Sequence, residues 1–315
     1  MKVYNSIDEF VKTGCPVVTT GTFDGVHTGH LQIIRRLKET AQRCNGETVL
    51  LTFFPHPRMV LFPDRKQLLL SSQDEKIELL RAAGIDHLVI HPFTREFSML
   101  TSQEFIRKIL VEKLGTKKLV IGHDHHFGRN REGSFEHLRE FGPVYGFDVE
   151  EIPAHEVEHV NVSSTRIRKA LETCDVSDAA RLLGYYYRLS GTVVKGNQLG
   201  RTIGYPTANI RVNDPDKLSP ANGIYAVIVK YRDKKYGGML SIGVRPTIGE
   251  GLERTTEVNI FNFDKDIYGE SLTVEFVKYL RPEEKYPSLE LLQKQLAADK
   301  LDSIEALKNE NLETV

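Results

Sequence analysis

The sequence predicts two domains of different fold class, an α/β domain followed by an all-β domain. In the first half, short apolar runs alternate with amphipathic stretches of helical length, which is the pattern of βαβ units around a parallel sheet. In the second half, β-branched and aromatic runs follow one another without helices between them, which is typical of an antiparallel barrel or sandwich. A length of 315 residues also allows two hydrophobic cores.

The elements expected in the first half follow from these apolar runs. The predicted strands are Val17–Thr20, Thr48–Phe54, His87–His91, Lys118–Ile121 and Phe147–Ile152. The predicted helices are Leu31–Cys44, Ser72–Ala83, Ser102–Leu114, Ser164–Thr173 and Val176–Leu183. Gly84 and Gly115 are typical helix stops, and Thr101 or Ser102 before Glu104 indicates a helix start. We therefore expect right-handed crossovers and a parallel sheet that is covered on both faces.

The second half starts near Gly184–Arg188, so the predicted domains are residues 1–185 and 186–315. Its predicted strands are Leu189–Val194, Tyr205–Ile210, Ile224–Tyr231, Gly238–Val244, Thr256–Phe263 and Leu272–Leu280. Helical patterning returns only near the end, where Leu289, Leu292 and Leu296 share one face. The polar stretch Lys300–Val315 is expected to fray.

Composition excludes several classes of protein. A net charge of -1 argues against a nucleic-acid-binding surface, so an anionic ligand must be held by local chemistry. The N-terminal residues do not resemble a signal peptide, and no apolar run is long enough to span a bilayer. Cys15, Cys44 and Cys174 are scattered along the chain with no close pair, which argues against a disulfide framework and fits a reducing compartment. We therefore expect a cytoplasmic protein.

The segment Gly21–His30 has the strongest functional pattern in the first half. It follows a buried strand, is rich in glycine and leads into an amphipathic helix. This arrangement directs backbone N–H groups and a helix N-terminus towards an anion. His27 and His30, three residues apart, would lie on one face of the first helical turn, where they add donors for a phosphate group. The segment therefore predicts a nucleotide phosphate site.

Two further polar clusters follow strands or open helices in this half, at Gly122–Gly128 and Ser163–Arg168. Ligands of open parallel sheets bind at the carboxyl ends of the strands, so all three clusters are candidates for one site. Each cluster also has a simpler interpretation. Ser164 can be an ordinary helix cap and Arg168 a solvated helix position, while the histidines between His123 and His126 could instead bind a transition metal.

Two common nucleotide-binding motifs are absent. Gly191 and Gly196 have the glycine spacing of a phosphate-binding P-loop, but the Lys-Ser/Thr pair that must follow is missing. No Gly-x-Gly-x-x-Gly motif follows the first predicted strand. A standard P-loop kinase and a nicotinamide-dependent dehydrogenase are both disfavoured.

In the second half, glycines crowd the region before Thr207. Such glycines allow a backbone to approach a ligand closely, although they can also be ordinary barrel bends. Thr207 and Asn209 are two apart, so on a strand their oxygens project to one face, and such oxygens suit Mg²⁺ with phosphates. Glu257 on a later strand can accept a proton from an attacking hydroxyl, or it can be a surface residue.

These motifs together resemble the bacterial bifunctional riboflavin kinase/FMN adenylyltransferase family, also called FAD synthetases. Gly21–His30 matches the family's form of the HxGH nucleotidyltransferase signature, and Ser163–Arg168 matches its SSTxIR segment. Gly200–Asn209 matches the kinase segment G-R-x-x-G-x-P-T-x-N. Ile267–Gly269 and Tyr279–Pro282 match later kinase segments. HxGH alone occurs in several adenylyltransferases, but its combination with PTxN in this order is specific.

The resemblance implies a Rossmann-like nucleotidyltransferase domain and a riboflavin kinase β-barrel with a terminal helix. The barrel would transfer the γ-phosphoryl group of ATP to riboflavin, and the first domain would adenylylate the resulting FMN with a second ATP to give FAD and pyrophosphate. Riboflavin, FMN, FAD and ATP are the implied partners, Mg²⁺ is the implied cofactor, and we expect a monomer or weak homo-oligomer. The alternative is that the adenylyltransferase alone is active and the β-domain is a flavin-binding regulatory module.

The resemblance also implies roles for particular residues. His27, His30 and Arg168 would stabilise charge during adenylyl transfer, and Glu257 would be the base of the kinase. The implied nucleotide-binding residues are Gly21, Phe23, Asp24, Gly25, Gly29, Ser164, Thr165, Gly196, Gly200, Arg201 and Thr202. The implied metal ligands are Thr207 and Asn209, and the implied flavin contacts are Asp124, Phe127 and Arg281. The sequence departs from many relatives at Phe54, where an acidic residue is usual, at Asn259, where His is usual, and at Asp124, which is often Asn.

Overall fold

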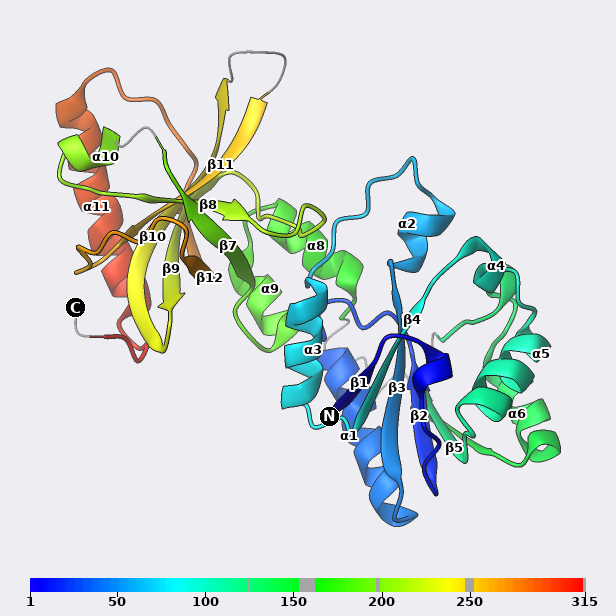
Figure 1. The fold of residues 1–315 in the computed structure, drawn as a ribbon. Helices are drawn as coiled ribbons and strands as arrows, with labels where there is room; N and C mark the ends of the chain where they lie inside the picture. Colours follow the sequence, from blue (N-terminus) through cyan, green and yellow to red (C-terminus); the bar gives the residue numbers. More distant parts are fainter. Residues whose placement is uncertain (124, 153–161, 197–198, 247–251, 314–315) are drawn as a thin grey trace. The chain divides into compact units, whose positions relative to one another are not determined.

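The chain divides into two units, Met1–Ser164 and Thr165–Val315 (Figure 1). The computed structural model describes all residues except 124, 153–161, 197–198, 247–251 and 314–315. The first unit is an α/β sandwich around a parallel sheet, and the second is built on a closed antiparallel barrel. Both predicted fold classes are confirmed, and the choice between barrel and sandwich is settled in favour of the barrel.

A six-stranded sheet forms the centre of the first unit, with the strand order β1-β4-β3-β2-β5-β6. All of its neighbouring strands are parallel. The strands are β1 (Lys2–Tyr4), β2 (Pro16–Thr20), β3 (Glu47–Phe54), β4 (His87–Pro92), β5 (Lys118–Gly122) and β6 (Asp148–Ile152). The chain moves from β2 to β3 and β4 on one side, then crosses to β5 and β6 on the other. The order therefore reverses between β2 and β5, which is where open α/β sheets bind ligands.

Helices cover both faces of this sheet (Figure 1). One core combines Val17 and Leu50 with side chains of α1 and α3, and the other combines Val18 and Leu51 with side chains of η2 and α6. Strand residues alternate between the two cores because successive side chains point to opposite faces. The helical segments are η1 (Ile7–Glu9), α1 (Thr28–Arg43), α2 (Pro57–Leu61), α3 (Gln73–Ala82), α4 (Arg95–Ser98), α5 (Ser102–Glu104), η2 (Phe105–Lys113), η3 (Arg129–Arg131) and α6 (Phe135–Tyr145).

The second unit contains a closed barrel with the strand order β10-β11-β8-β7-β12-β9. Its strands are β7 (Arg188–Val194), β8 (Ala208–Val212), β9 (Gly223–Tyr231), β10 (Lys234–Pro246), β11 (Leu252–Ile260) and β12 (Ser271–Arg281). Its helices are α8 (Ser164–Glu172, whose first residue belongs to the first unit), α9 (Val176–Leu183), α10 (Leu199–Thr202) and α11 (Leu289–Leu307). Helix α11 packs against β9, β10 and β12, so nearly all of β9 is buried.

Several details of the prediction were wrong. Strand β1 and helix α6 were not predicted, and the strand expected from Tyr205 begins only at Ala208. The helix expected over 102–114 is a short α-helical turn that continues as the π-helical segment η2. Residues after Lys300 were expected to fray, but α11 continues to Leu307 because Ser303 and Leu307 are buried.

Helices α8 and α9 belong with the barrel in the second unit, although the sequence boundary was placed after them. The backbone N–H of Ala221 donates to the carbonyl of Leu171 at the end of α8, at 2.9 Å. Helix α9 packs against β12 of the barrel. The two units therefore divide about twenty residues before the predicted boundary at 185/186.

Candidate active sites

The turn between β2 and α1 lies at the switch point of the parallel sheet. Phe23, Gly25 and Val26 adopt left-handed backbone conformations, with φ of 46°, 81° and 38°. Left-handed backbone costs Phe and Val about 1–2 kcal/mol each. Both side chains are almost fully buried, which contributes about 1.5–3 kcal/mol each and offsets the strain. The tight turn is therefore held in shape by its own hydrophobic residues.

The two predicted histidines meet at the N-terminus of α1. His27 is the N-cap, and its Nδ1 accepts a hydrogen bond from the backbone N–H of His30 at 3.3 Å. The two rings stack with centroids 3.6 Å apart, and Phe23 packs against His30 at 4.7 Å. Burial, with His27 and Lys76 nearby, holds the pKa of His30 well below its usual range. His30 is therefore a neutral imidazole near pH 7, and its Nδ1 has no hydrogen-bond partner among the described residues.

Asp24 points away from the exposed side of this turn. Its carboxylate is buried and accepts hydrogen bonds from the backbone N–H groups of Leu70, at 2.9 Å, and Ser71, at 3.2 Å. The N–H of Gly25 in turn donates to the hydroxyl of Ser71 at 3.1 Å. These contacts fasten the turn to the segment that precedes α3. The geometry therefore gives the Asp24 side chain an anchoring position.

Lys76 on α3 is a member of this site that the sequence reasoning missed. Its Nζ donates to the carbonyl of Thr22 at 2.9 Å. Burial lowers the pKa of Lys76, while the charge of Asp24 acts in the opposite direction. A lysine directly before Ile77 on a predicted helix was the available signal, but solvated lysines are far more common than buried ones.

Ser164, in the serine-rich segment, contacts the turn through its hydroxyl. The hydroxyl of Ser164 donates to the carbonyl of Asp24 at 3.1 Å, which joins residues 140 positions apart. Thr165 and Arg168 follow on α8, where Thr165 is exposed and Arg168 is half-buried.

Phe127, in the loop after β5, lies in the sheet core against Phe105, with ring centroids 5.4 Å apart. The expected flavin contact Asp124 lies outside the described residues.

The described residues form no metal-binding cluster around His123, His125 and His126. Among the residues that the structure describes, no group of three or more His, Cys, Asp or Glu side chains is arranged to hold a metal ion. His126 Nδ1 instead lies 3.3 Å from the carbonyl oxygen of Gly133. The geometry of the described residues therefore does not support the metal interpretation of this cluster.

The second candidate site lies where β8 and β11 pair in the barrel. Asn209 and Glu257 are direct partners across the antiparallel ladder. The Thr207 hydroxyl donates to Glu257 Oε2 at 3.3 Å. A hydroxyl, an amide and a carboxylate therefore converge from residues up to 50 positions apart. These hard oxygen donors fit Mg²⁺, the cation that the sequence motif implies.

Glycines leave room for this group of oxygens. A Cβ on Gly196 would lie 2.1 Å from Asn209 Nδ2, and a Cβ on Gly200 would lie 2.2 Å from the carbonyl oxygen of Tyr205. The clash at Gly200 is with backbone and excludes a larger residue, whereas a side chain at Gly196 would displace the Asn209 side chain. Arg201 and Thr202 are exposed on α10 between these glycines and Thr207. The glycine-rich segment therefore packs closely over the start of β8, as a phosphate-binding loop would require.

A cavity of about 300 Å³ opens beside Glu257 and contains the predicted residue Arg281. Arg281 forms a bidentate pair with the buried carboxylate of Asp299, at 2.8 and 2.7 Å. Asp299 raises the pKa of Arg281 and fixes α11 against the end of β12. Apolar and aromatic side chains form much of the remaining wall, which suits a planar ring system. They are Ile203, Tyr205, Ile224, Met239, Leu240, Tyr286, Leu292 and Leu296.

Asn259, one of the departures from the family pattern, stabilises the backbone of this second candidate site. It is buried, and its Nδ2 donates to the carbonyl of Pro206 at 2.7 Å. This bond holds the backbone immediately before Thr207. The replacement therefore leaves the arrangement of Thr207 and Glu257 intact.

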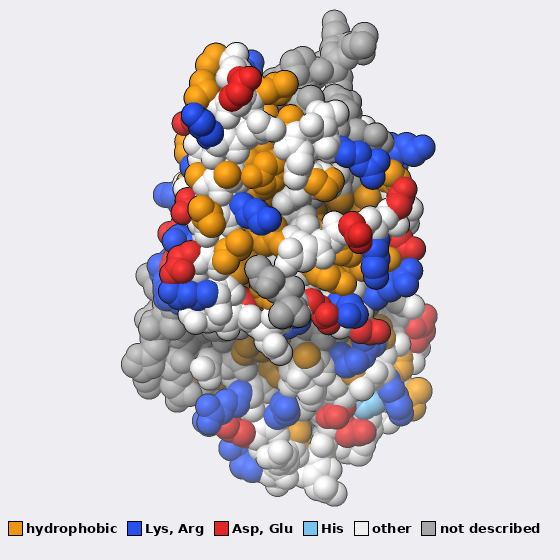
Figure 2. Space-filling model, turned by 90° about the vertical axis from the view of Figure 1, so that its left-hand side faces the viewer, with side chains coloured by type: hydrophobic (Ala, Val, Ile, Leu, Met, Phe, Trp, Pro, Cys, Tyr) orange, Lys and Arg blue, Asp and Glu red, His pale blue; other side chains and the backbone are white. Residues whose placement is uncertain are grey.

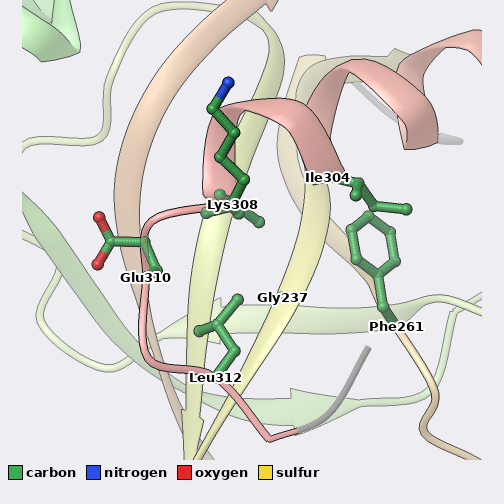
Figure 3. A pocket seen from close by; sticks show the side chains of 7 residues that line it. Gly237, Phe261, Ile304, Lys308, Glu310 and Leu312 are labelled. Carbon is green, nitrogen blue, oxygen red and sulfur yellow. The ribbon is translucent and has the colours of Figure 1, made fainter.

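A second cavity in this unit, of about 330 Å³, has a different character (Figure 3). It lies beneath the C-terminal end of α11 and is lined by Gly237, Phe261, Ile304, Leu307, Lys308, Glu310 and Leu312. It contains none of the predicted site residues. Its polar groups are a single lysine and glutamate on the segment that closes it. The chemistry therefore favours the cavity beside Glu257.

The face of the molecule shown in Figure 2 carries mixed charge. On the face that Figure 2 presents, lysines and arginines are interspersed with aspartates and glutamates, without a continuous basic area. Within the described residues, no helix is both long enough and apolar enough to cross a membrane.

Comparisons with known proteins match the two halves of the chain to two different families. The family model for FAD synthetase matches residues 11–166, and the model for riboflavin kinase matches residues 183–307. The bifunctional riboflavin kinase/FMN adenylyltransferase of Escherichia coli K12 is 36% identical and covers 96% of this chain and 95% of its own. The Haemophilus influenzae protein of the same name is 38% identical, covering 92% of this chain and 93% of its own.

A solved structure has the same fold over nearly the whole chain. It is a crystal structure described as a macrolide-efflux protein from Streptococcus pneumoniae, with a TM-score of 0.88 and 34% identity. The match covers 98% of this chain and 99% of that one. With the two family models and the full-length relatives, these observations show that the chain belongs to the bifunctional riboflavin kinase/FMN adenylyltransferase family.

Proposed function

We propose that this protein makes FMN and then FAD, each step using one ATP. In the first step the riboflavin 5′-hydroxyl attacks the γ-phosphorus and ADP leaves. In the second, an FMN phosphate oxygen attacks the α-phosphorus of another ATP and pyrophosphate leaves. The observation that supports this function best is the presence of two different phosphate-chemistry sites in one chain. One is the His27/His30 pair at the sheet switch point, and the other is the Thr207–Glu257 contact in the barrel.

In the kinase step, Glu257 accepts the proton of the riboflavin hydroxyl as the oxygen attacks. The oxygens of Thr207 and Asn209 would hold Mg²⁺, which supplies positive charge to the transferring phosphoryl group when bound. The glycine-rich segment of Gly196 and Gly200, with Arg201 and Thr202, holds the ATP phosphates through close backbone approach. Arg281, fixed by Asp299, borders the flavin in the cavity beside Glu257.

In the adenylyl-transfer step, the turn from Gly21 to His27 and the N-terminus of α1 receive the ATP phosphates, where Gly29 permits close approach. His27 Nδ1 already accepts a hydrogen bond, so the ring carries a proton on Nε2 that it can donate to a phosphate oxygen. His30 is held neutral by burial and can also act as a donor. Thr165 and Arg168 add further donors, while Ser164 also supports the turn at Asp24. The loop around Asp124 and Phe127 would border the flavin of this step.

The functional division that we propose is an adenylyltransferase domain at 1–185 and a kinase domain at 186–315. The FAD synthetase match ends at 166 and the riboflavin kinase match begins at 183, which leaves most of α8 and α9 between them. We also propose a cytoplasmic enzyme that is a monomer or weak homo-oligomer, because ATP is supplied in that compartment and the surface in Figure 2 is mixed in charge.

A product assay tests this function. The protein is incubated with riboflavin, ATP and Mg²⁺, and the flavins are separated over time. We expect FMN to rise first and FAD to follow, with FAD absent when ATP is omitted. Formation of FAD only from supplied FMN would mean that the barrel is a flavin-binding module without turnover, and absence of both products would contradict the proposal.

A further inference from the structure

Two cysteines that are 29 positions apart in the sequence meet at the end of β2 opposite the glycine-rich turn. Cys15 immediately precedes β2, and Cys44 caps the C-terminus of α1. Their sulfur atoms lie 2.6 Å apart. Both are free thiols and both are partly exposed, so a small reagent can reach them. Their separation along the chain does not predict that they meet.

The backbone holds the two residues together. The carbonyl of Cys15 accepts a hydrogen bond from Glu47 N–H at 3.1 Å, at the point where β2 and β3 begin to pair. Gly46 lies beneath the pair, and a Cβ there would come within 2.9 Å of Cys44 Sγ and 3.0 Å of Cys15 Cβ. The turn from α1 to β3 therefore brings Cys44 onto Cys15 at a spacing that a disulfide can bridge with little movement.

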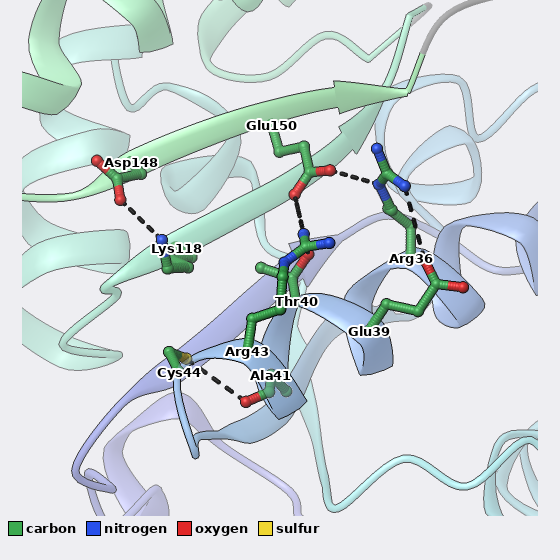
Figure 4. A network of polar contacts seen from close by, with 9 residues as sticks. All are labelled: Arg36, Glu39, Thr40, Ala41, Arg43, Cys44, Lys118, Asp148 and Glu150. Carbon is green, nitrogen blue, oxygen red and sulfur yellow. Dashed lines mark hydrogen bonds and ion pairs between the residues drawn. The ribbon is translucent and has the colours of Figure 1, made fainter.

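Polar contacts fix the helix end that carries Cys44 (Figure 4). Glu150 on β6 accepts hydrogen bonds from Thr40 at 2.9 Å and Arg43 at 3.1 Å, and also pairs with Arg36. The Cys44 thiol is directed towards the carbonyl of Ala41 in the same helical turn, at 3.6 Å. Because the last turn of α1 is tied to the sheet, Cys44 stays next to Cys15.

The two thiols differ in their surroundings. Burial and the neighbouring Cys44 raise the pKa of Cys15 to about 11, although Lys117 and Lys118 act in the opposite direction. Cys15 is therefore protonated at neutral pH. Because the thiolate is the reactive form of cysteine, we expect Cys15 to be the slower of the two thiols to attack.

We propose that Cys15 and Cys44 form a redox dithiol that a low-molecular-weight disulfide, such as oxidised glutathione, converts reversibly to an intramolecular disulfide. The Cys44 thiolate attacks one glutathione sulfur, which forms a mixed disulfide and releases one glutathione thiolate. Cys15 then loses its proton and attacks Cys44 Sγ, which releases the second glutathione. Two electrons pass from the protein thiols to the glutathione disulfide, and the two protons end on the glutathione thiols.

A disulfide between Cys15 and Cys44 would close a loop that contains the whole turn from Gly21 to His30. A crosslink of this span restricts the unfolded chain and stabilises the folded one. The bond forms at the opposite end of β2 from the histidines, so the catalytic geometry is left unchanged. We expect the midpoint of thermal unfolding of the first unit to rise by roughly 5–10 °C on oxidation, and the rate of FAD formation to change less than twofold.

The test uses the reduced full-length protein incubated with oxidised glutathione without air. Mass spectrometry is expected to show loss of two hydrogen atoms, a Cys15–Cys44 peptide in the unreduced digest, and full reversal by dithiothreitol. Cys174→Ser is the matched control and should behave like the wild type. An unchanged mass, a crosslink that includes Cys174, or only glutathione adducts on the wild-type protein would overturn the proposal.

Two single variants test the order of attack and do not depend on catalysis. Cys15→Ser should stop at one glutathione bound to Cys44, because no second thiol is present to release it. Cys44→Ser should gain glutathione at least tenfold more slowly, because only the protonated Cys15 remains. Equal rates for the two variants would contradict the assignment of Cys44 as the attacking thiol. Unfolding curves of both reduced variants check that each is folded.

Discussion

The two candidate sites use the same co-substrate but are built from opposite kinds of group. The turn at the end of β2 offers donors, namely backbone N–H groups and the stacked imidazoles of His27 and His30. The barrel offers acceptors, namely the oxygens of Thr207, Asn209 and Glu257. The difference follows from the attacking group. An FMN phosphate is already an anion and needs only charge stabilisation, whereas a riboflavin hydroxyl must first lose a proton.

Their construction differs in the same way. The first site depends on one short turn whose left-handed residues are held by burial, so most of it is local in sequence. The second depends on strand register, which places Glu257 opposite Asn209 from a distant part of the chain. Because separate parts of the chain build the two sites, a change at one site should leave the reaction of the other intact.

The largest effect is expected for His30→Ala. Loss of this donor should slow FAD formation by at least ~10³-fold, because charge at the α-phosphate loses a preorganised partner. FMN should still accumulate from riboflavin at the wild-type rate. The measurement is flavin separation over time, with His137→Ala on α6 as the matched control. Loss of both products would show that the two sites are not independent.

Glu257→Gln should have the converse effect. Without a base, FMN formation should slow by ~10²–10⁴-fold, while FAD formation from supplied FMN remains normal. Glu270→Gln changes a partly exposed glutamate that pairs with Arg232 and serves as the control. An unaltered kinase rate in the Glu257 variant would remove this residue from the role of base.

Asp299→Ala tests how the barrel site is supported. The variant leaves the Arg281 guanidinium without its buried partner, which should destabilise the second unit by about 3–5 kcal/mol. It should also raise the KM for riboflavin, since Arg281 lines the cavity. Urea unfolding and kinase kinetics measure the two effects. Asp302→Ala, an exposed position on the same helix, should change neither; equal behaviour of the two variants would count against the buried pair.

The smallest expected effect concerns pH and is confined to the first unit. The pKa of His30 is depressed in the folded chain, mainly by burial, so the unfolded chain binds the proton at higher pH. The stabilising contribution of the neutral ring is therefore present above the unfolded pKa of ~6.5 and is lost as pH falls through the folded value.

Urea midpoints at a series of pH values between neutral and acidic measure this effect. His30→Gln should lose less stability than the wild type as the pH falls. The pKa of His91 is also lowered by burial, but this contribution is common to both proteins and cancels in the comparison. Parallel pH curves for the two proteins would mean that His30 is not held neutral by the fold.

Local signals in the sequence were sufficient for the two fold classes and most of the elements. Periodicity placed most strands and helices within a few residues. The motifs indicated His27 and His30 in the first domain, and Thr207, Asn209 and Glu257 in the second. The predictions were wrong where an element was very short or where a polar residue was buried. Strand β1 is only three residues long, and α11 continues past Lys300 because its polar residue Ser303 is buried against the barrel.

The sequence by itself determined the two chemistries, because the turn at Gly21–His30 and the segment around Thr207 are short and carry their own residue types. Only the tertiary structure decided which distant groups join them. Lys76 reaches the turn from α3, Asp299 fixes Arg281 from α11, and Cys44 meets Cys15 across the end of α1. No local pattern marks such residues, because their proximity is produced by crossovers, strand register and burial that a linear sequence does not display.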